Sequence, residues 1–218
     1  MYKNIFNNIR LIKLMDCCKF DSLARYYKPL RKYFGNGKMH AEIIRSTIKL
    51  NKNMKLLDIG GGTGEISNYF VNDVKEISIL DPSKEMLSKI DSNKIKRFCG
   101  SAEKIPFKNN SFDIIYCVDS LHHFTNSKDI KEWRKVIRTS INEMSRVLNK
   151  KGTIIIIEFN PQKIGGKIIK FIENSLYNFG SSFYDPNSLG DLFKTEGMSS
   201  KLEYERGHTY VLKITKNI

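Results

Sequence analysis

The sequence predicts an α/β fold in which a mostly parallel sheet is covered by helices on both faces. Three observations support this fold class: a glycine-rich turn directly after a short apolar run, an aspartate at the end of the next apolar run, and alternating apolar runs and helical patterns through residues 55–160. Alternation of this kind is typical of parallel sheets, because each helix returns the chain to the edge where the next strand begins.

The first 54 residues are predicted to form a basic helical cap. Apolar residues recur there at helical spacing, at Ile5, Phe6, Ile9 and Ile12. Such a helix covers a core or lies on a membrane surface. Residues 1–55 hold 13 Lys or Arg against 3 Asp or Glu, a balance of +10, out of +14 for the whole chain. This charge favours an anionic partner, such as a small acid, a lipid surface or RNA; the alternative is a lysine-rich composition with solvated side chains.

Five apolar runs predict strands, and three helical patterns lie among them. The predicted strands are residues 56–59, 77–80, 95–99, 112–118 and 153–159, and the predicted helices are residues 64–71, 84–90 and 129–148. In the last of these helices the apolar residues fall on one face, which indicates packing against a core. Cys99 and Cys117 are expected in or at the ends of buried strands, as reduced thiols.

The remaining chain predicts a lid-like insertion and a terminal hairpin. Residues 163–179 form a basic, helix-like stretch interrupted by Gly165 and Gly166. Asp185 is expected to cap a last helix, and residues 201–205 and 209–215 are expected to pair as an antiparallel hairpin. No repeat or low-complexity linker is visible, so residues 1–218 are predicted to form a single domain, with 1–54 as the cap, 55–160 as the core and 161–218 as the lid and hairpin.

The most informative motif is the glycine-rich turn at residues 58–64, which reads Asp-Ile-Gly-Gly-Gly-Thr-Gly. Glycines at alternate positions allow positive φ angles and a close approach of the backbone to a ligand. Asp81 ends the next strand, where a carboxylate can bind a ribose diol, so the two features predict an adenosine-bearing cofactor. The third glycine of a dinucleotide fingerprint is replaced by Glu65, whose charge repels a pyrophosphate; NAD and FAD are therefore disfavoured.

This turn resembles motif I of the class I S-adenosylmethionine-dependent methyltransferases. Residues 79–87 resemble the second motif of that family, residues 100–107 its adenine loop, and residues 112–116 and 146–157 its fourth strand, following helix and fifth strand. Residues 20–27 resemble a segment of the ubiquinone/menaquinone-biosynthesis branch, although Lys28 stands where that branch usually has Asp. The resemblance implies a Rossmann-like, seven-stranded, mostly parallel sheet with a C-terminal antiparallel hairpin. It also implies S-adenosylmethionine as cofactor and S-adenosylhomocysteine as product.

The resemblance further implies roles for individual residues. Asp58 orients the loop and the cofactor ammonium, Gly60 and Gly62 meet the methionine moiety, Asp81 binds the ribose, and Met86 packs on the adenine. The full set implied for cofactor binding is Tyr27, Asp58, Gly60, Gly61, Gly62, Gly64, Asp81, Pro82, Met86, Ser101, Ala102, Glu103, Cys117 and Val118. Core packing is the alternative for Met86 and Cys117, and Ser101 stands where the family often has Asp.

His122 and His123 follow the fourth predicted strand, at the edge where an acceptor should lie. Histidine is the side chain whose ordinary pKa suits a general base, so the pair is the candidate catalytic group; the alternative is helix capping or substrate packing. No metal site is predicted from the cysteines, because none of the four has Cys-x-x-Cys spacing.

The predicted activity is methyl transfer to a small acceptor, partly apolar or anionic, such as a quinone precursor or a lipid-like compound. The alternatives are an RNA methyltransferase, disfavoured because residues 117–120 lack an Asn/Asp-Pro-Pro-aromatic motif, and a non-catalytic cofactor-binding subunit. No apolar run approaches the roughly 18 residues that span a bilayer. The expected localisation is therefore cytoplasmic, with peripheral membrane contact as a further hypothesis.

Overall fold

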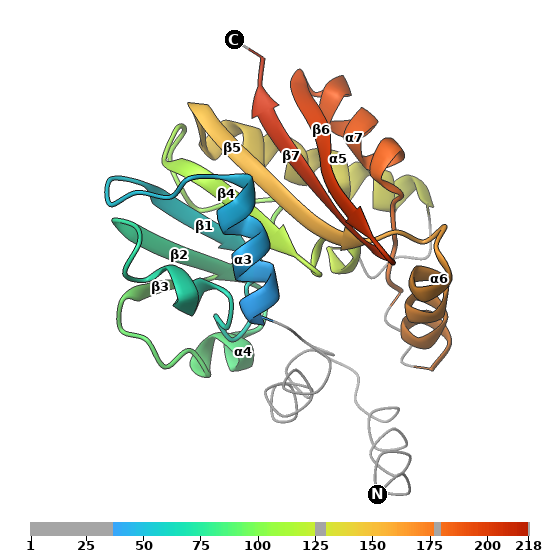
Figure 1. The fold of residues 1–218 in the computed structure, drawn as a ribbon, viewed down its shortest axis with the longest axis horizontal. Helices are drawn as coiled ribbons and strands as arrows, with labels where there is room; N and C mark the ends of the chain where they lie inside the picture. Colours follow the sequence, from blue (N-terminus) through green and yellow to red (C-terminus); the bar gives the residue numbers. More distant parts are fainter. Residues whose placement is uncertain (1–36, 125–129, 177–179, 218) are drawn as a thin grey trace, which may run out of the picture.

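The computed structural model describes residues 37–124, 130–176 and 180–217, and a seven-stranded sheet runs through them (Figure 1). The strand order is β3 (Ile95–Cys99), β2 (Glu76–Asp81), β1 (Lys55–Ile59), β4 (Phe112–Val118), β5 (Leu148–Phe159), β7 (Thr209–Lys216) and β6 (Met198–Arg206). Only β7 runs against its neighbours, because it pairs antiparallel with both β5 and β6. The predicted fold class, a mostly parallel sheet ending in an antiparallel hairpin, is confirmed.

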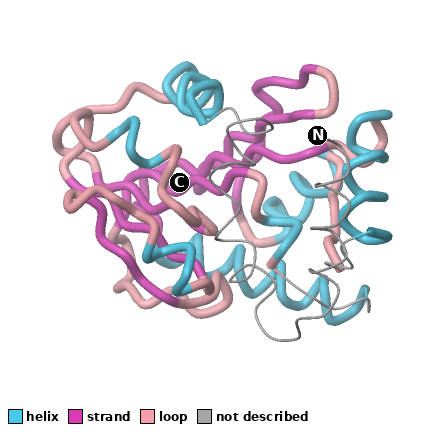
Figure 2. Tube along the Cα trace, turned by 90° about the horizontal axis from the view of Figure 1, so that it is seen from below, coloured by secondary structure: helices cyan, strands magenta, loops and turns pink. Residues whose placement is uncertain are grey.

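Helices cover both faces of the sheet, and the strands lie between them (Figure 2). On one face, α3 (Gly37–Thr47), the 3₁₀ turn η1 (Ser67–Phe70) and α4 (Lys84–Ser88) lie against a core that includes Ile44 and Phe70. On the other face, α5 (Ile130–Val147) and α7 (Pro186–Thr195) contribute Ile141 and Phe193. The apolar stripe of α5 predicted from the sequence therefore faces the core, as its 3.6-residue period requires.

The order of the strands places the functional edge of the sheet. The chain moves outward from β1 through β2 to β3, then returns to the other side of β1 to form β4. Adjacent loops leave β1 and β4 in opposite directions at such a switch point, which opens a crevice at the carboxyl ends of the two strands. The glycine-rich turn follows β1 and the histidine pair follows β4, so both predicted motifs lie at this point.

The first predicted helix, residues 64–71, is wrong in length and type. The structure has only the 3₁₀ turn η1 at Ser67–Phe70. Gly64 has a φ of +71°, which is incompatible with a right-handed helix at that residue. The 3₁₀ turn η1 therefore begins only at Ser67, after the glycine-rich loop, in which Gly64 has a left-handed backbone.

The lid-like segment forms α6 (Ile164–Phe171) and continues as a π-helical turn, η3 (Ile172–Leu176). Gly165 and Gly166 lie inside α6 and do not interrupt it as expected. A Cβ atom built on Gly166 would collide with the backbone carbonyl of Asn160, and one on Gly165 would lie 2.5 Å from Nδ1 of His208. The two glycines therefore let the helix pack closely against the end of β5 and the hairpin turn.

Other boundaries differ from the predicted ones by small amounts. The helix predicted at residues 84–90 ends at Ser88, and β5 begins at Leu148, before the predicted residue 153. Asp185 caps α7 as predicted, because its Oδ1 accepts hydrogen bonds from the N–H groups of Asn187 and Ser188, both at 3.1 Å. Cys117 is buried as expected, whereas the Cys99 thiol at the end of the edge strand β3 is exposed.

Two predictions concern residues outside the described part of the chain. The basic amphipathic helix near Ile5 and the cofactor residue Tyr27 both precede residue 37. The single domain over residues 1–218 likewise includes them and stays a prediction. None of the helices in the described ranges combines the length and the apolar character that crossing a bilayer requires.

Candidate active site

The glycine-rich turn after β1 adopts the backbone that its sequence predicts. Gly60, Gly62 and Gly64 have φ angles of +72°, +53° and +71°. Gly60 approaches the β4 loop so closely that an added Cβ would lie 2.6 Å from the Cβ of Ser120. Around Gly62, by contrast, an added Cβ would meet only the Asp81 carboxylate, at 4.0 Å, among the described residues. The turn is thus packed on one side and leaves room beside Gly62.

Asp81 joins the end of β2 to this turn. Its Oδ2 accepts a hydrogen bond from the Gly62 N–H at 2.9 Å, and its Oδ1 accepts one from the Ser83 N–H at 2.8 Å. The side chain is buried. These two hydrogen bonds hold the carboxylate beside the glycine turn, at the strand end where a ribose diol is expected.

Asp58 lies beneath the turn in a buried polar network. Its Oδ2 accepts the Ser67 hydroxyl at 2.7 Å, and the Ser67 Oγ lies 2.5 Å from the Tyr116 hydroxyl. Burial, followed by the charge of Asp58, raises the pKa of Tyr116 well above its ordinary value, so Tyr116 keeps its proton and donates it to Ser67. A Cβ on Gly61 would lie 2.5 Å from Cγ and Oδ2 of Asp58. Gly61 therefore lets the turn rest on the carboxylate.

The residues predicted to surround the adenine follow β2 and β3. Met86 lies in α4 and is buried, and the side chain of Ser83 caps this helix by accepting the Met86 N–H at 3.1 Å. The carbonyl of Pro82 accepts a hydrogen bond from the Cys99 thiol at 3.5 Å. Ala102 is buried, whereas the side chains of Ser101 and Glu103 are exposed. The loops that carry these residues leave adjacent strands at the same edge of the sheet.

At the end of β4, two predicted residues pack into the protein. Cys117 is completely buried in the core that includes Ile137 and Leu212. Its thiol donates to the Ser120 hydroxyl at 2.9 Å, because that hydroxyl itself donates to the Ile59 carbonyl at 3.0 Å. Val118 is also buried. The side chain of Cys117 thus serves core packing, and the Ser120 side chain is what reaches the glycine turn.

The histidine pair lies in the 3₁₀ turn η2 (Leu121–His123), which is anchored by Glu158 at the end of β5. Oε1 of Glu158 accepts the backbone N–H of Leu121 at 2.8 Å, and Oε2 accepts Nδ1–H of His122 at 2.6 Å. The His122 ring stacks on Phe183, with ring centroids 4.5 Å apart and planes at 15°. His122 is therefore a buried side chain held by a carboxylate and an aromatic ring.

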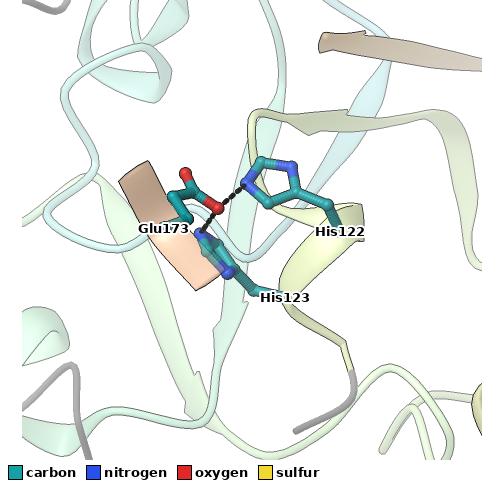
Figure 3. A group of neighbouring side chains, drawn as sticks. All are labelled: His122, His123 and Glu173. Atoms are coloured by element: carbon teal, nitrogen blue, oxygen red, sulfur yellow. Dashed lines mark ion pairs between the residues drawn. The ribbon is translucent and has the colours of Figure 1, made fainter. Parts of the chain in front are cut away.

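Glu173 of η3 faces both histidines (Figure 3). Its Oε2 lies 3.6 Å from Nε2 of His122 and 3.9 Å from Nε2 of His123. Nδ1 of His123 is 3.0 Å from the Ser181 hydroxyl. The lid segment thus brings an acidic group over the loop that follows β4.

The two histidines differ in their expected charge. Burial alone lowers the pKa of His122, but the Glu158 carboxylate, with Glu173 behind it, outweighs burial and raises this pKa to about 10. Burial, and then the charge of His122, lowers the pKa of His123 well below its ordinary value. The described structure therefore favours an imidazolium at His122 beside a neutral His123.

Comparison with known proteins agrees with this geometry. A family model described as a methyltransferase domain matches residues 57–156, which include the glycine turn, Asp81 and the histidine pair. The uncharacterised protein MJ1252 of Methanocaldococcus jannaschii is 30% identical over 212 residues, covering 91% of this chain and 79% of its own length. The chain belongs to the class I S-adenosylmethionine-dependent methyltransferases. The demethylmenaquinone methyltransferase of Thermotoga maritima is 29% identical over 163 residues, covering 70% of this chain and 66% of that protein.

Other matches limit what the family alone establishes. YcgJ, an uncharacterised methyltransferase of Bacillus subtilis, is 29% identical to this chain over 146 residues. The match covers 64% of this chain and only 53% of YcgJ. In fold, a complex of the Haloferax volcanii Trm112 methyltransferase activator with a methyltransferase matches with a TM-score of 0.73 at 13% identity, over 94% of this chain and 100% of that one. The [4+2]-cyclase SpnF matches with a TM-score of 0.66 at 15% identity, over 83% of this chain and 81% of that one. A methyltransferase fold therefore does not by itself define the reaction.

A second family model, of ANAPC2-like TPR repeats, matches residues 1–100. TPR repeats consist of paired helices. Residues 55–99 instead form three parallel strands, β1, β2 and β3, with short helical turns between them. The fold of this segment is that of a methyltransferase.

The residues at the edge of β1 and β2 fit S-adenosylmethionine, the cofactor of this family. The space beside Gly62 suits a ligand that approaches the backbone, and the Asp81 carboxylate stands at the strand end where folds of this kind bind a ribose diol. The carboxylate of Glu65, directly after the turn, would repel a pyrophosphate, a group that S-adenosylmethionine lacks. When bound, the sulfonium of this cofactor supplies an activated methyl group.

Sequence reasoning missed several residues that complete the site. Ser67 and Tyr116 hold Asp58, and Glu158, Glu173 and Ser181 surround the histidines. Glu158 had a local signal, because it is the one acid in the otherwise apolar run Ile154 to Phe159. Glu173 had none, because it reaches the histidines only through the placement of the lid.

Proposed function

We propose that this protein transfers a methyl group from S-adenosylmethionine to a small, partly apolar acceptor of the quinone-precursor or lipid-like class. The observation that supports S-adenosylmethionine as the methyl donor is the hydrogen bond from the Gly62 N–H to the Asp81 carboxylate. The similarity to the Thermotoga maritima demethylmenaquinone methyltransferase supports the acceptor class. Aromatic rings around the histidine pair, including Phe183 and Phe159, offer an apolar acceptor surface.

In this proposal the cofactor residues divide by loop. Asp58 and the glycines at 60, 61, 62 and 64 hold the methionine end, and Asp81 with Pro82 holds the ribose. Met86, Ser101, Ala102 and Glu103 surround the adenine. The backbone of Cys117 and Val118 lies under the transferred methyl group, and Tyr27 closes the site. Methyl transfer needs an aligned nucleophile and exclusion of water more than it needs acid or base, because the leaving group is already activated.

The histidine pair forms the acceptor end of the proposed site. A general base at His122 or His123 stays a prediction. His123 is the better candidate of the two, because its pKa is lowered and it is neutral at physiological pH. His122 positions the turn η2 through Glu158.

An anionic membrane surface is the proposed source of the acceptor, and helix α6 supports it. Four large apolar side chains lie on one exposed stripe of this helix and its continuation: Ile164, Ile168, Phe171 and Ile172, which are 79%, 53%, 62% and 37% exposed. Lys163, Lys167 and Lys170 are exposed along one side of the stripe. An apolar stripe flanked by lysines is the chemistry by which helices bind anionic lipid headgroups and the adjoining acyl chains.

Calorimetry and a transfer assay test the proposal together. S-adenosylmethionine and S-adenosylhomocysteine should bind to the full chain with micromolar-range affinity, while NAD should not. Label from methyl-labelled S-adenosylmethionine should appear in a prenylated demethyl-quinone presented in anionic vesicles. Tight NAD binding would overturn the cofactor assignment. Label in structured RNA would favour an RNA methyltransferase, and cofactor binding without transfer to any acceptor class would favour a non-catalytic subunit.

A further inference from the structure

Three side chains near the acceptor end of the site direct their potential metal-binding atoms at one point. One ring nitrogen of His122, one of His123 and one carboxylate oxygen of Glu173 all lie within 4.8 Å of one another (Figure 3). The histidines come from the turn after β4 and the glutamate from the lid, so two separate parts of the fold contribute to the cluster.

The opposite nitrogen of each imidazole is already engaged. Nδ1 of His122 is 2.6 Å from Oε2 of Glu158, and Nδ1 of His123 is 3.0 Å from Oγ of Ser181. Histidines that bind metals almost always donate their other ring N–H to a carboxylate, carbonyl or other polar group, which fixes the tautomer and the ring orientation. Here both rings have their Nδ1 atoms held in this way, and both Nε2 atoms turn toward Glu173.

The separations within the cluster are too long for direct hydrogen bonds. Oε2 of Glu173 lies 3.6 Å from one Nε2 atom and 3.9 Å from the other, whereas such bonds are usually about 2.7–3.2 Å long. This oxygen is buried and has no hydrogen-bond partner in the described structure. An ion bound tetrahedrally with ligand distances of about 2.1 Å holds its ligand atoms about 3.4 Å apart. A cation at the centre, reached by a small inward movement of the three side chains, would therefore give the Glu173 oxygen a partner.

We propose that His122, His123 and Glu173 form a binding site for a divalent first-row metal ion such as Zn²⁺ or Fe²⁺, with Glu158 and Ser181 as positioning residues. Two imidazoles and one carboxylate favour these ions over Mg²⁺ or Ca²⁺, which prefer oxygen ligands alone. The ion displaces the Nε2 proton of His122, so binding releases that proton to solvent. Three protein ligands leave at least one coordination position open. That position suits an oxygen anion, such as a phenolate or carboxylate of an acceptor.

The site also connects the lid to the core. Asn174, next to Glu173, donates a hydrogen bond from Nδ2 to the Ser181 carbonyl at 2.8 Å, and the Ser182 N–H donates to the His122 carbonyl at 2.9 Å. These bonds hold η3, the chain at residues 181–182 and the histidine turn in one arrangement. The three ligands are therefore placed before an ion arrives, which reduces the ordering that binding requires.

Metal titration of the tag-free full chain, first stripped with a chelator, tests this site. Zn²⁺ binding followed by calorimetry and Co²⁺ binding followed by visible absorption should each show one equivalent. The Co²⁺ spectrum should lack the intense near-ultraviolet band of thiolate ligation, which separates this site from the four cysteines. Glu173→Gln and His123→Asn should each weaken binding at least tenfold, the lower end of the effect seen for supporting residues.

Glu196→Gln is the matched control, because Glu196 is 15% exposed, close to the 16% of Glu173, and has its own cationic partner, Arg138. This variant should bind both metals as the original protein does. Binding of S-adenosylhomocysteine by every variant shows that each is folded. If the original protein binds neither ion, or if Glu173→Gln binds them equally tightly, the metal site is overturned. The proposed methyl transfer would then stand or fall separately on the cofactor and label experiments.

Discussion

The carboxylate of Asp81 accepts a hydrogen bond from the backbone N–H of Gly62 at 2.9 Å, which ties the end of β2 to the turn that follows β1. The two strands pair in parallel, with Ile59 beside Leu80, so both turns leave the sheet at the same level. Asp81 thus has two functions in the proposed site: it shapes the glycine turn and it binds the ribose.

Replacement of Asp81 should weaken cofactor binding. Asp81→Ala removes the acceptor for Gly62 and the proposed ribose contact, and we expect S-adenosylhomocysteine to bind about 1–3 kcal/mol more weakly, the usual cost of leaving buried polar partners unpaired. Calorimetry measures this difference. Asp73→Ala is the control, because Asp73 pairs with Arg45 on the surface, and it should leave the affinity unchanged. Equal affinity of Asp81→Ala and the original protein would contradict the proposed role.

Replacement of Gly61 tests whether the turn must rest on Asp58. The added methyl group of Gly61→Ala would lie 2.5 Å from the Asp58 carboxylate, which is held by Ser67 and cannot move without breaking that hydrogen bond. We expect a loss of about 1–3 kcal/mol in the free energy of unfolding, typical of overpacking, and weaker S-adenosylhomocysteine binding.

Gly207→Ala provides the comparison for this variant. Gly207 lies in the hairpin turn with a φ of +63° and with nothing within 4 Å of an added Cβ among the described residues. Its replacement should cost about 1–2 kcal/mol of stability for the left-handed backbone alone and should leave cofactor affinity intact. Urea unfolding and calorimetry distinguish the two. Unchanged cofactor binding in Gly61→Ala would show that the turn tolerates displacement from Asp58.

The lysines of α6 should control binding to anionic membranes. Lys167→Glu combined with Lys170→Glu should reduce retention by anionic vesicles at least roughly tenfold at low salt, because each basic residue near such a surface contributes about 1 kcal/mol. Retention of the original protein should fall as ionic strength rises. The control, Lys194→Glu with Lys201→Glu, changes the net charge equally at exposed positions of α7 and β6. Equal effects of the two pairs would assign binding to net charge and not to α6.

The histidine pair should affect turnover more than cofactor binding. His123→Asn should lower the rate of methyl transfer by roughly 100-fold or more, the contribution typical of a general base, while S-adenosylhomocysteine affinity stays nearly constant. His122→Asn should also lower the rate, because it removes the contact with Glu158 that positions the turn η2. His208→Asn, in the hairpin turn next to Gly165, is the control and should retain activity. Full turnover in both variants of the pair would leave these residues as packing or capping groups.

Elements with strong local patterns could be predicted well, and elements that depend on contacts could not. The strand β4 and the helix α5 were predicted to within one or two residues of their observed ends. An apolar run and a 3.6-residue apolar stripe are each visible in a short window of sequence. The helix expected at residues 64–71 became the four-residue turn η1, because the backbone of Gly64 is set by the cofactor loop and not by helix propensity. Gly165 and Gly166 were expected to interrupt a helix, but α6 runs through them. The contacts that require glycine there are with residues distant in the sequence, so the sequence did not reveal them.

The sequence by itself determined the fold class, the glycine turn and the position of Asp81. These follow from local signals, because strands in a parallel sheet all end at one edge, and a residue at the end of a strand is therefore placed without knowledge of its neighbours. Only the tertiary structure decided what surrounds the histidines. Glu158 and Glu173 approach them from β5 and from the lid, and the pairing of β5 with β4 and the packing of α6 bring them there. No spacing along the chain encodes those contacts, because they depend on how separate elements pack in three dimensions.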